Sequence, residues 1–156
     1  MDIKEDILQF FGGMMKFEII MYLSRLAFLK TTPRKSVAVI SISDPDQVVS
    51  NLEGWGDVLE LKFCDLVSPA CGLPIFTGRD ALKTVEFLEQ TSCQNLLVHC
   101  EAGVSRSGAV AYFAAEKSGV PRVYSMDTLE EVGSSKVINK RVMELLQHVY
   151  RRKYSA

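Results

Sequence analysis

The residue types most able to do chemistry in this sequence are a cysteine and an arginine separated by five residues, Cys100 and Arg106. An apolar run, Asn95–Val98, precedes them and predicts a buried strand. An alanine-rich stretch, Ser107–Lys117, follows them with the spacing of a helix. The residues between strand and helix therefore form a loop that opens a helix, where backbone N–H groups and the helix dipole attract anions.

The spacing within this loop is suited to binding phosphate. Gly103 allows a turn or a close backbone approach, so successive N–H groups can point inward. The guanidinium of Arg106 can bind two phosphate oxygens at once. The same positive field favours thiolate over thiol at Cys100, which would make it a nucleophile at neutral pH. The loop thus predicts a phosphate site that contains a nucleophile.

The segment His99-Cys100-Glu101-Ala102-Gly103-Val104-Ser105-Arg106-Ser107-Gly108 resembles the His-Cys-(five residues)-Arg-Ser signature of the protein-tyrosine-phosphatase superfamily, and its small dual-specificity branch in particular. The resemblance implies that Cys100 attacks phosphorus to form a phosphocysteine, that Arg106 holds the phosphoryl group and that Ser107 helps the thiolate leave. It also implies that His99 supports the loop and the thiolate without touching substrate. The N–H groups implied in substrate binding belong to Glu101, Ala102, Gly103, Val104, Ser105 and Arg106.

The leaving oxygen of a phosphomonoester also needs a proton, which a carboxylic acid on another loop can supply. The resemblance implies an aspartate just after an earlier strand, and Asp65 follows the alternating strand pattern of Val58–Phe63. Asp57 lies at the opposite end of that strand. Asp80 is the reserve candidate, although it fits better in the cap and first turn of a helix over Gly78–Gln90.

Other structural roles and functions also fit parts of this pattern. Taken alone, Cys100 would be a small buried apolar residue and Ser107 an ordinary helix N-cap. A rhodanese-like cysteine loop would transfer sulfur, and a phosphoprotein-binding module would keep the phosphate cradle without turnover. The serine after Arg106 and the lack of a second large domain disfavour the first alternative. Retention of Cys100, Arg106, Ser107 and Asp65 disfavours the second.

The resemblance implies hydrolysis of phosphotyrosine, with phosphoserine and phosphothreonine also admitted, and no metal or other cofactor. The expected partner is therefore a phosphorylated protein or peptide. A net charge of −1 argues against a general nucleic-acid or membrane-surface binder. The acidic start of the chain lacks an apolar signal core, which favours a cytoplasmic location.

The cysteine spacing gives neither the close pairs of a zinc site nor a disulfide framework. Cys64 adjoins Asp65, so it could trap an oxidised Cys100 as a disulfide, or it could be a buried apolar residue at a strand end. The four cysteines are Cys64, Cys71, Cys93 and Cys100.

The chain of 156 residues, with 47% apolar and 24% charged residues, is expected to form one phosphatase-like domain over residues 17–156. Residues 1–16 are expected to be an N-terminal extension or packing helix. Strand and helix patterns alternate, which predicts an α/β fold with a mostly parallel central sheet flanked by helices, as in protein tyrosine phosphatases. The predicted strands cover residues 17–23, 37–42, 58–63 and 95–99, and the predicted helices 24–30, 78–90 and 107–117, with two more helical stretches after Gly119, the last over 137–150.

Overall fold

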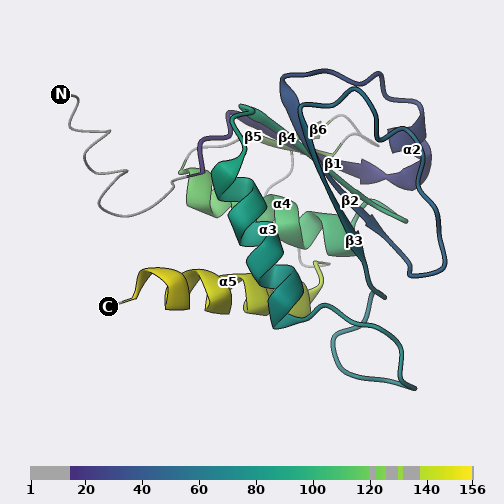
Figure 1. The fold of residues 1–156 in the computed structure, drawn as a ribbon, viewed down its shortest axis with the longest axis vertical. Helices are drawn as coiled ribbons and strands as arrows, with labels where there is room; N and C mark the ends of the chain where they lie inside the picture. Colours follow the sequence, from purple (N-terminus) through teal and green to yellow (C-terminus); the bar gives the residue numbers. More distant parts are fainter. Residues whose placement is uncertain (1–14, 120–121, 126–129, 132–137, 156) are drawn as a thin grey trace.

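A computed structural model describes residues 15–119, 122–125, 130–131 and 138–155. It confirms the predicted α/β class: one sheet with strand order β3-β2-β4-β1-β5-β6 is flanked by helices (Figure 1). Strands β1 to β5 are parallel, and the short β6 is antiparallel to β5. In chain order the elements are β1 (Ile19–Ser24), α2 (Arg25–Leu29), β2 (Val37–Ser43), β3 (Asp57–Lys62), α3 (Gly78–Gln90), β4 (Asn95–Cys100), α4 (Ser105–Ser118), β5 (Arg122–Ser125), β6 (Glu130–Glu131) and α5 (Lys140–Tyr154).

The strand register brings the carboxyl ends of four strands to one edge of the sheet. Ser24 at the end of β1 pairs with Cys100 at the end of β4, and Ser43 of β2 pairs with Lys62 of β3. The loops that leave these strands therefore start side by side. This edge is where open α/β sheets place their ligand sites.

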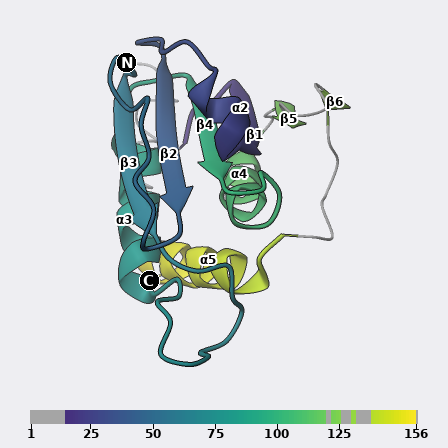
Figure 2. The same ribbon diagram turned by 90° about the vertical axis from the view of Figure 1, so that its right-hand side faces the viewer.

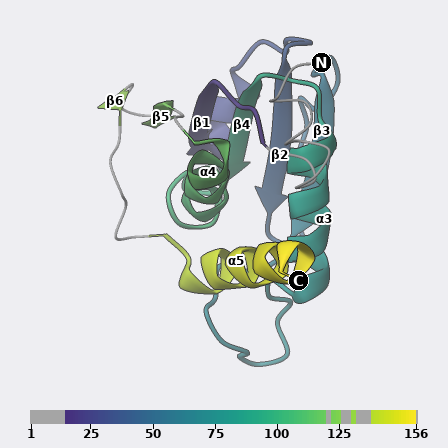
Figure 3. The ribbon, with the colours of Figure 1, turned by 90° about the vertical axis from the view of Figure 1, so that its left-hand side faces the viewer.

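Helices cover the two faces of the sheet unequally. Helices α3, α4 and α5 lie on one face (Figure 3), and the short α2 lies on the other (Figure 2). The larger core is on the three-helix face and includes Phe63, Phe76 and Phe113. A smaller cluster on the α2 face contains Phe28 and Trp55.

Helix starts follow the capping residues of the sequence. The α3 helix begins with a capping box, in which Thr77 Oγ1 accepts from Asp80 N and Asp80 Oδ2 accepts from Thr77 N. Ser24 caps α2, and Asn139 caps α5 by accepting from the N–H group of Val142. The predicted helix over Gly78–Gln90 is confirmed at both ends.

The prediction is wrong in the segment after Gly119. Two helical stretches were expected there, but residues 122–125 form β5, which pairs with β1 in parallel. The segment Arg122-Val123-Tyr124-Ser125 contains a β-branched and an aromatic residue, and pairing with β1 satisfies its backbone groups. The last helix begins at Lys140 instead of residue 137, because the side chain of Asn139 caps it.

The expected N-terminal extension, residues 1–16, falls outside the described residues except for Met15 and Lys16. The Met15 side chain is buried in the larger core. Over the described ranges, no helix combines the length and apolar character needed to cross a membrane.

The smaller core cluster generates a stability prediction. Phe28 is fully buried, with its ring centroid 5.8 Å from that of Trp55 and 4.2 Å from that of His99. Phe28→Ala would leave a cavity beneath the sheet edge and should lower the free energy of unfolding by about 3–5 kcal/mol. Urea denaturation measures this change. Leu26→Ala, at an exposed position of the same helix, is the matched control and should change stability by less than about 0.5 kcal/mol.

Candidate active site

The loop between β4 and α4 folds tightly against the junction of β1 and α2. Gly103 has φ +72°, and a Cβ atom at this position would lie 2.3 Å from the backbone nitrogen of Ser24. The backbone N–H of Arg25 donates to Glu101 O, which links the loop to the start of α2. Only glycine allows this approach, so the curvature of the loop depends on Gly103.

The amino end of α4 faces this loop without a side-chain cap. Val104 is the N-cap residue and its side chain makes no capping hydrogen bond. An uncapped helix start of this kind can bind an anion through its first-turn N–H groups.

Ser107 is not the N-cap that its sequence pattern alone suggested. The helix begins two residues earlier, at Ser105, so Ser107 lies in the first turn. Its buried Oγ lies 3.1 Å from Cys100 Sγ. The hydroxyl is therefore placed to donate to a thiolate at Cys100.

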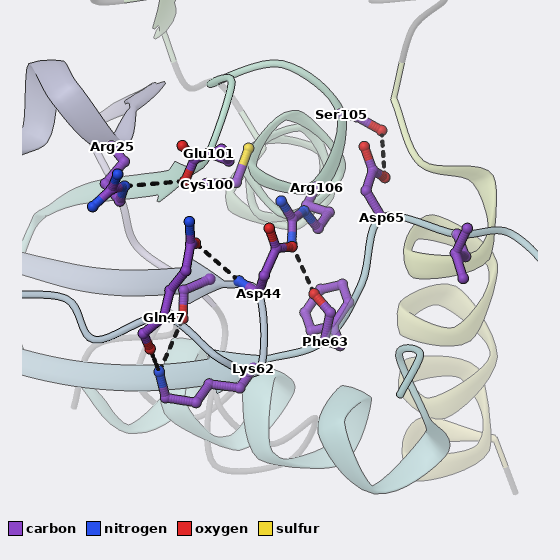
Figure 4. A network of polar contacts seen from close by, with 12 residues as sticks. Arg25, Asp44, Gln47, Lys62, Phe63, Asp65, Cys100, Glu101, Ser105 and Arg106 are labelled. Atoms are coloured by element: carbon purple, nitrogen blue, oxygen red, sulfur yellow. Dashed lines mark hydrogen bonds and ion pairs between the residues drawn. The ribbon is translucent and has the colours of Figure 1, made fainter. Parts of the chain in front are cut away.

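Arg106 is a buried cation, and one of its donor atoms has no hydrogen-bond partner among the described residues. Its Nη1 donates to Asp44 Oδ1 at 2.8 Å and to Phe63 O at 2.7 Å (Figure 4). Its side chain is only 5% exposed, and its buried Nε has no hydrogen-bond partner among the described residues. A buried guanidinium edge without a partner is costly, and an anion bound beside it would satisfy it.

Asp44 is a site residue that the sequence analysis missed. It follows β2 directly, and the Asp44 N–H donates to Gln47 Oε1 at 3.3 Å. Lys62 Nζ supports the same turn, because it donates to Ser43 Oγ at 3.1 Å and to Gln47 O. The position of Asp44 could have indicated its role. It follows β2, the strand that pairs with β4, so it lies at the same edge of the sheet as Cys100.

Asp65, the predicted acid, lies beside the cysteine loop. Its Oδ1 accepts a hydrogen bond from Ser105 Oγ at 2.9 Å (Figure 4) and another from Asn139 Nδ2 at 2.7 Å. The base of its loop is closed by the Cys64 N–H, which donates to Pro74 O at 2.8 Å. Asn139, at the start of α5, is a second residue that sequence reasoning missed.

The two other aspartates considered from the sequence, Asp57 and Asp80, form hydrogen bonds away from the cysteine loop. Asp80 Oδ2 accepts from Thr77 in the capping box of α3. Asp57 begins β3, as predicted, and accepts from Thr91 Oγ1 at 2.6 Å. Asp65 is thus the one of the three that contacts the cysteine loop.

Glu101, the acidic residue of the cysteine loop, forms an ion pair with Arg25. Glu101 Oε2 accepts from Arg25 Nε at 3.0 Å, and both side chains are partly exposed (Figure 4). Because of this ion pair, the carboxylate of Glu101 is not an unpaired negative charge next to the loop where an anion is expected to bind.

His99 lies on the opposite face of β4 from Cys100, because side chains alternate along a strand. Its Nε2 lies 2.6 Å from Ser41 Oγ, and its ring stacks on Phe28. The pKa of His99 is lowered to about 4, chiefly by burial and to a smaller extent by the charges of Arg25 and Arg106. His99 is therefore neutral at pH 7, and its contribution to the loop is packing and hydrogen bonding.

All four cysteines are free thiols; Cys64 is half-buried and Cys100 is buried. In the described part of the chain, no cluster of three or more His, Cys, Asp or Glu side chains could hold a metal ion.

No family model matches the chain, and no curated protein matches it. Among solved structures, it is similar to one described as "Crystal structure of Tk-PTP in the active form". The identity is 19%, the match covers 86% of this chain and 80% of that chain, and the TM-score is 0.41. A likeness at this level does not show the activity of this chain.

The close approach at Gly103 can be tested by substitution. Gly103→Ala would push the loop away from Ser24 and disturb its N–H groups, so binding of inorganic phosphate should weaken at least about tenfold. Isothermal calorimetry measures this. Gly119→Ala is the matched control, because Gly119 also has positive φ but has open space around it. It should lose stability and keep phosphate affinity; equal affinities in the two variants would contradict the role given to Gly103.

The pKa of His99 predicts an acid-sensitive stability. Its folded value of about 4 is below the ordinary 6.5, so at intermediate pH the unfolded chain binds more protons than the folded chain. Stability from this group is complete above pH 6.5 and falls as the pH drops towards 4, by about 1.4 kcal/mol per unit and about 3 kcal/mol in all. Urea denaturation between pH 4 and 7 should show a shallower slope in His99→Gln than in wild type; identical slopes would exclude His99 as the cause.

Proposed function

We propose that this protein is a metal-independent phosphomonoesterase that acts on phosphorylated proteins through a phosphocysteine intermediate, like the cysteine-dependent protein tyrosine phosphatases. The observation that carries the proposal is the buried Arg106 Nε without a partner, in the loop that contains Cys100. The uncapped amino end of α4 adds N–H donors beside it. Together these groups suit the oxygens of a phosphate dianion.

In the first step, the Cys100 thiolate attacks phosphorus and an S–P bond forms as the bond to the leaving oxygen breaks. The electron pair of that bond stays on the leaving oxygen, which takes a proton from Asp65. Arg106 and the loop N–H groups stabilise the equatorial oxygens, over which charge is spread in the transition state.

In the second step, water attacks phosphorus and the S–P bond breaks. The Asp65 carboxylate, now ionised, takes the proton from the water. The Ser107 hydroxyl, 3.1 Å from Cys100 Sγ, donates to the departing thiolate. The products are inorganic phosphate and the starting enzyme, and no electron transfer takes place.

The proposed substrate is a phosphotyrosine side chain of a protein or peptide in the cytoplasm, with phosphoserine and phosphothreonine also admitted. An aryl phosphate fits the proposed chemistry because its phosphate can enter the loop while the ring stays outside. The cysteine loop carries no lysine, which does not favour a more highly charged phosphoinositide headgroup.

Phosphate release from an aryl phosphate, in a chelator and without added metal, tests the proposal. Cys100→Ser should abolish turnover, Arg106→Lys should lower kcat/KM by about 100-fold or more, and Asp65→Asn should lower kcat by about 100-fold or more. Cys93→Ser, at a half-buried cysteine outside the site, is the control and should keep wild-type kinetics.

Each contrary outcome points to a different error. Turnover by Cys100→Ser at the wild-type rate would overturn the covalent mechanism. Phosphate binding without release by the wild type would favour a binding module. Sulfur transfer from thiosulfate to cyanide, with no phosphate release, would favour the rhodanese-like alternative.

A further inference from the structure

We infer that Asn139 is a positioning residue that assigns the acid proton of Asp65 to Oδ2, and so sets which oxygen protonates the leaving group. This inference rests on the proposed function and adds a residue to it. Asn139 contacts neither the cysteine nor the arginine of the site through any hydrogen bond of the described structure. It acts through the carboxyl group of Asp65.

The orientation of the Asn139 amide is determined by a bond outside the site. Its Oδ1 accepts from the Val142 N–H at 3.1 Å, as an N-cap must. An amide turned the other way would place its NH₂ group against that N–H, where neither can accept. The Nδ2 donors therefore face the acid loop, towards Asp65 Oδ1 at 2.7 Å and Leu66 O at 3.2 Å.

This orientation determines where a proton on Asp65 can be. Oδ1 faces an NH₂ group, which cannot accept a hydrogen bond, and it also receives the Ser105 hydroxyl at 2.9 Å. A proton on Oδ1 would point at the NH₂ group of Asn139 and disrupt that hydrogen bond. A proton on Oδ2 leaves both hydrogen bonds to Oδ1 intact. Asp65 is an exposed residue, and both of these hydrogen bonds use Oδ1, which leaves Oδ2 to carry the proton.

Asn139 also joins three separate segments at this point. Its backbone N–H donates to Ser105 O at 3.0 Å, so the start of α5 is bonded to the first turn of α4. Its side chain reaches the acid loop from the same position, and Asn139 is only 3% exposed. The acid is thus held in a defined orientation relative to the cysteine loop.

The position of the proton on Asp65 should matter more for some leaving groups than for others. In the first step the proton on Oδ2 moves to the leaving oxygen as its bond to phosphorus breaks, and in the second step Oδ2 accepts a proton from water. A poor leaving group such as phenol depends on that proton, and nitrophenol, a better one, depends on it far less. Misplacing the proton should therefore slow phenyl phosphate more than p-nitrophenyl phosphate.

Two substitutions separate this role from helix capping. Asn139→Ser and Asn139→Asp both retain a side-chain oxygen that can cap α5, but neither offers an NH₂ donor to Asp65. The kcat/KM for phenyl phosphate, which reports the first step, should fall about 10–100-fold in each, while that for p-nitrophenyl phosphate should fall less than about threefold. In the Asp65→Asn background, either substitution should have little further effect on phenyl phosphate.

Glu89→Gln is the matched control for a general loosening of α5. It weakens the contacts of Glu89 with Lys153 and Tyr154 at the far end of the helix, and it should change the two esters to the same extent. Losses that are equal for the two esters in both Asn139 variants would overturn the inference while leaving the proposed function in place. A wild-type protein that releases phosphate from neither ester would instead overturn the proposed function.

Discussion

The site depends on the burial of one cation. Arg106 lies beneath the sheet edge with its Nη1 bonded to Asp44 and Phe63 O, and a guanidinium is expensive to bury unless its donors are satisfied. Two segments supply the acceptors that offset this cost: Asp44 follows β2, and Phe63 follows β3. Arg106 Nε stays without a hydrogen-bond partner among the described residues, and an anion at the cysteine loop is the partner that the proposed function gives it.

The alternation of side chains along β4 separates the two polar residues at its end. Cys100 points to the face covered by α4, and His99 points to the face covered by α2. Since burial lowers the pKa of His99 and keeps it neutral, it adds no positive charge beside the thiol. The positive field that the proposed mechanism needs at Cys100 would come from Arg106 and from the amino end of α4.

Sequence patterns predicted most of the elements and misjudged a few for local reasons. The start of the helix Gly78–Gln90 could be predicted because the two residues of its capping box, Thr77 and Asp80, are close together in the sequence. Residues 122–125 were expected to be helical, but an edge of the sheet was available and pairing with β1 decided their conformation. Ser107 resembled an N-cap by its position before an alanine-rich run, yet the loop geometry starts the helix at Ser105 and turns Ser107 towards Cys100.

The sequence by itself determined the cysteine loop, because the strand end, Gly103, Arg106 and the helix start are close neighbours along the chain and their geometry is local. Asp65 was predicted as the acid from the family resemblance together with the strand pattern before it, and that role stays a prediction. Only the tertiary structure decided that Asp44 holds Arg106 and that Asn139 orients Asp65, across separations of 62 and 74 residues. Hydrogen bonds are short and directional, so such partners are chosen by how distant segments pack at the sheet edge, which no local pattern records.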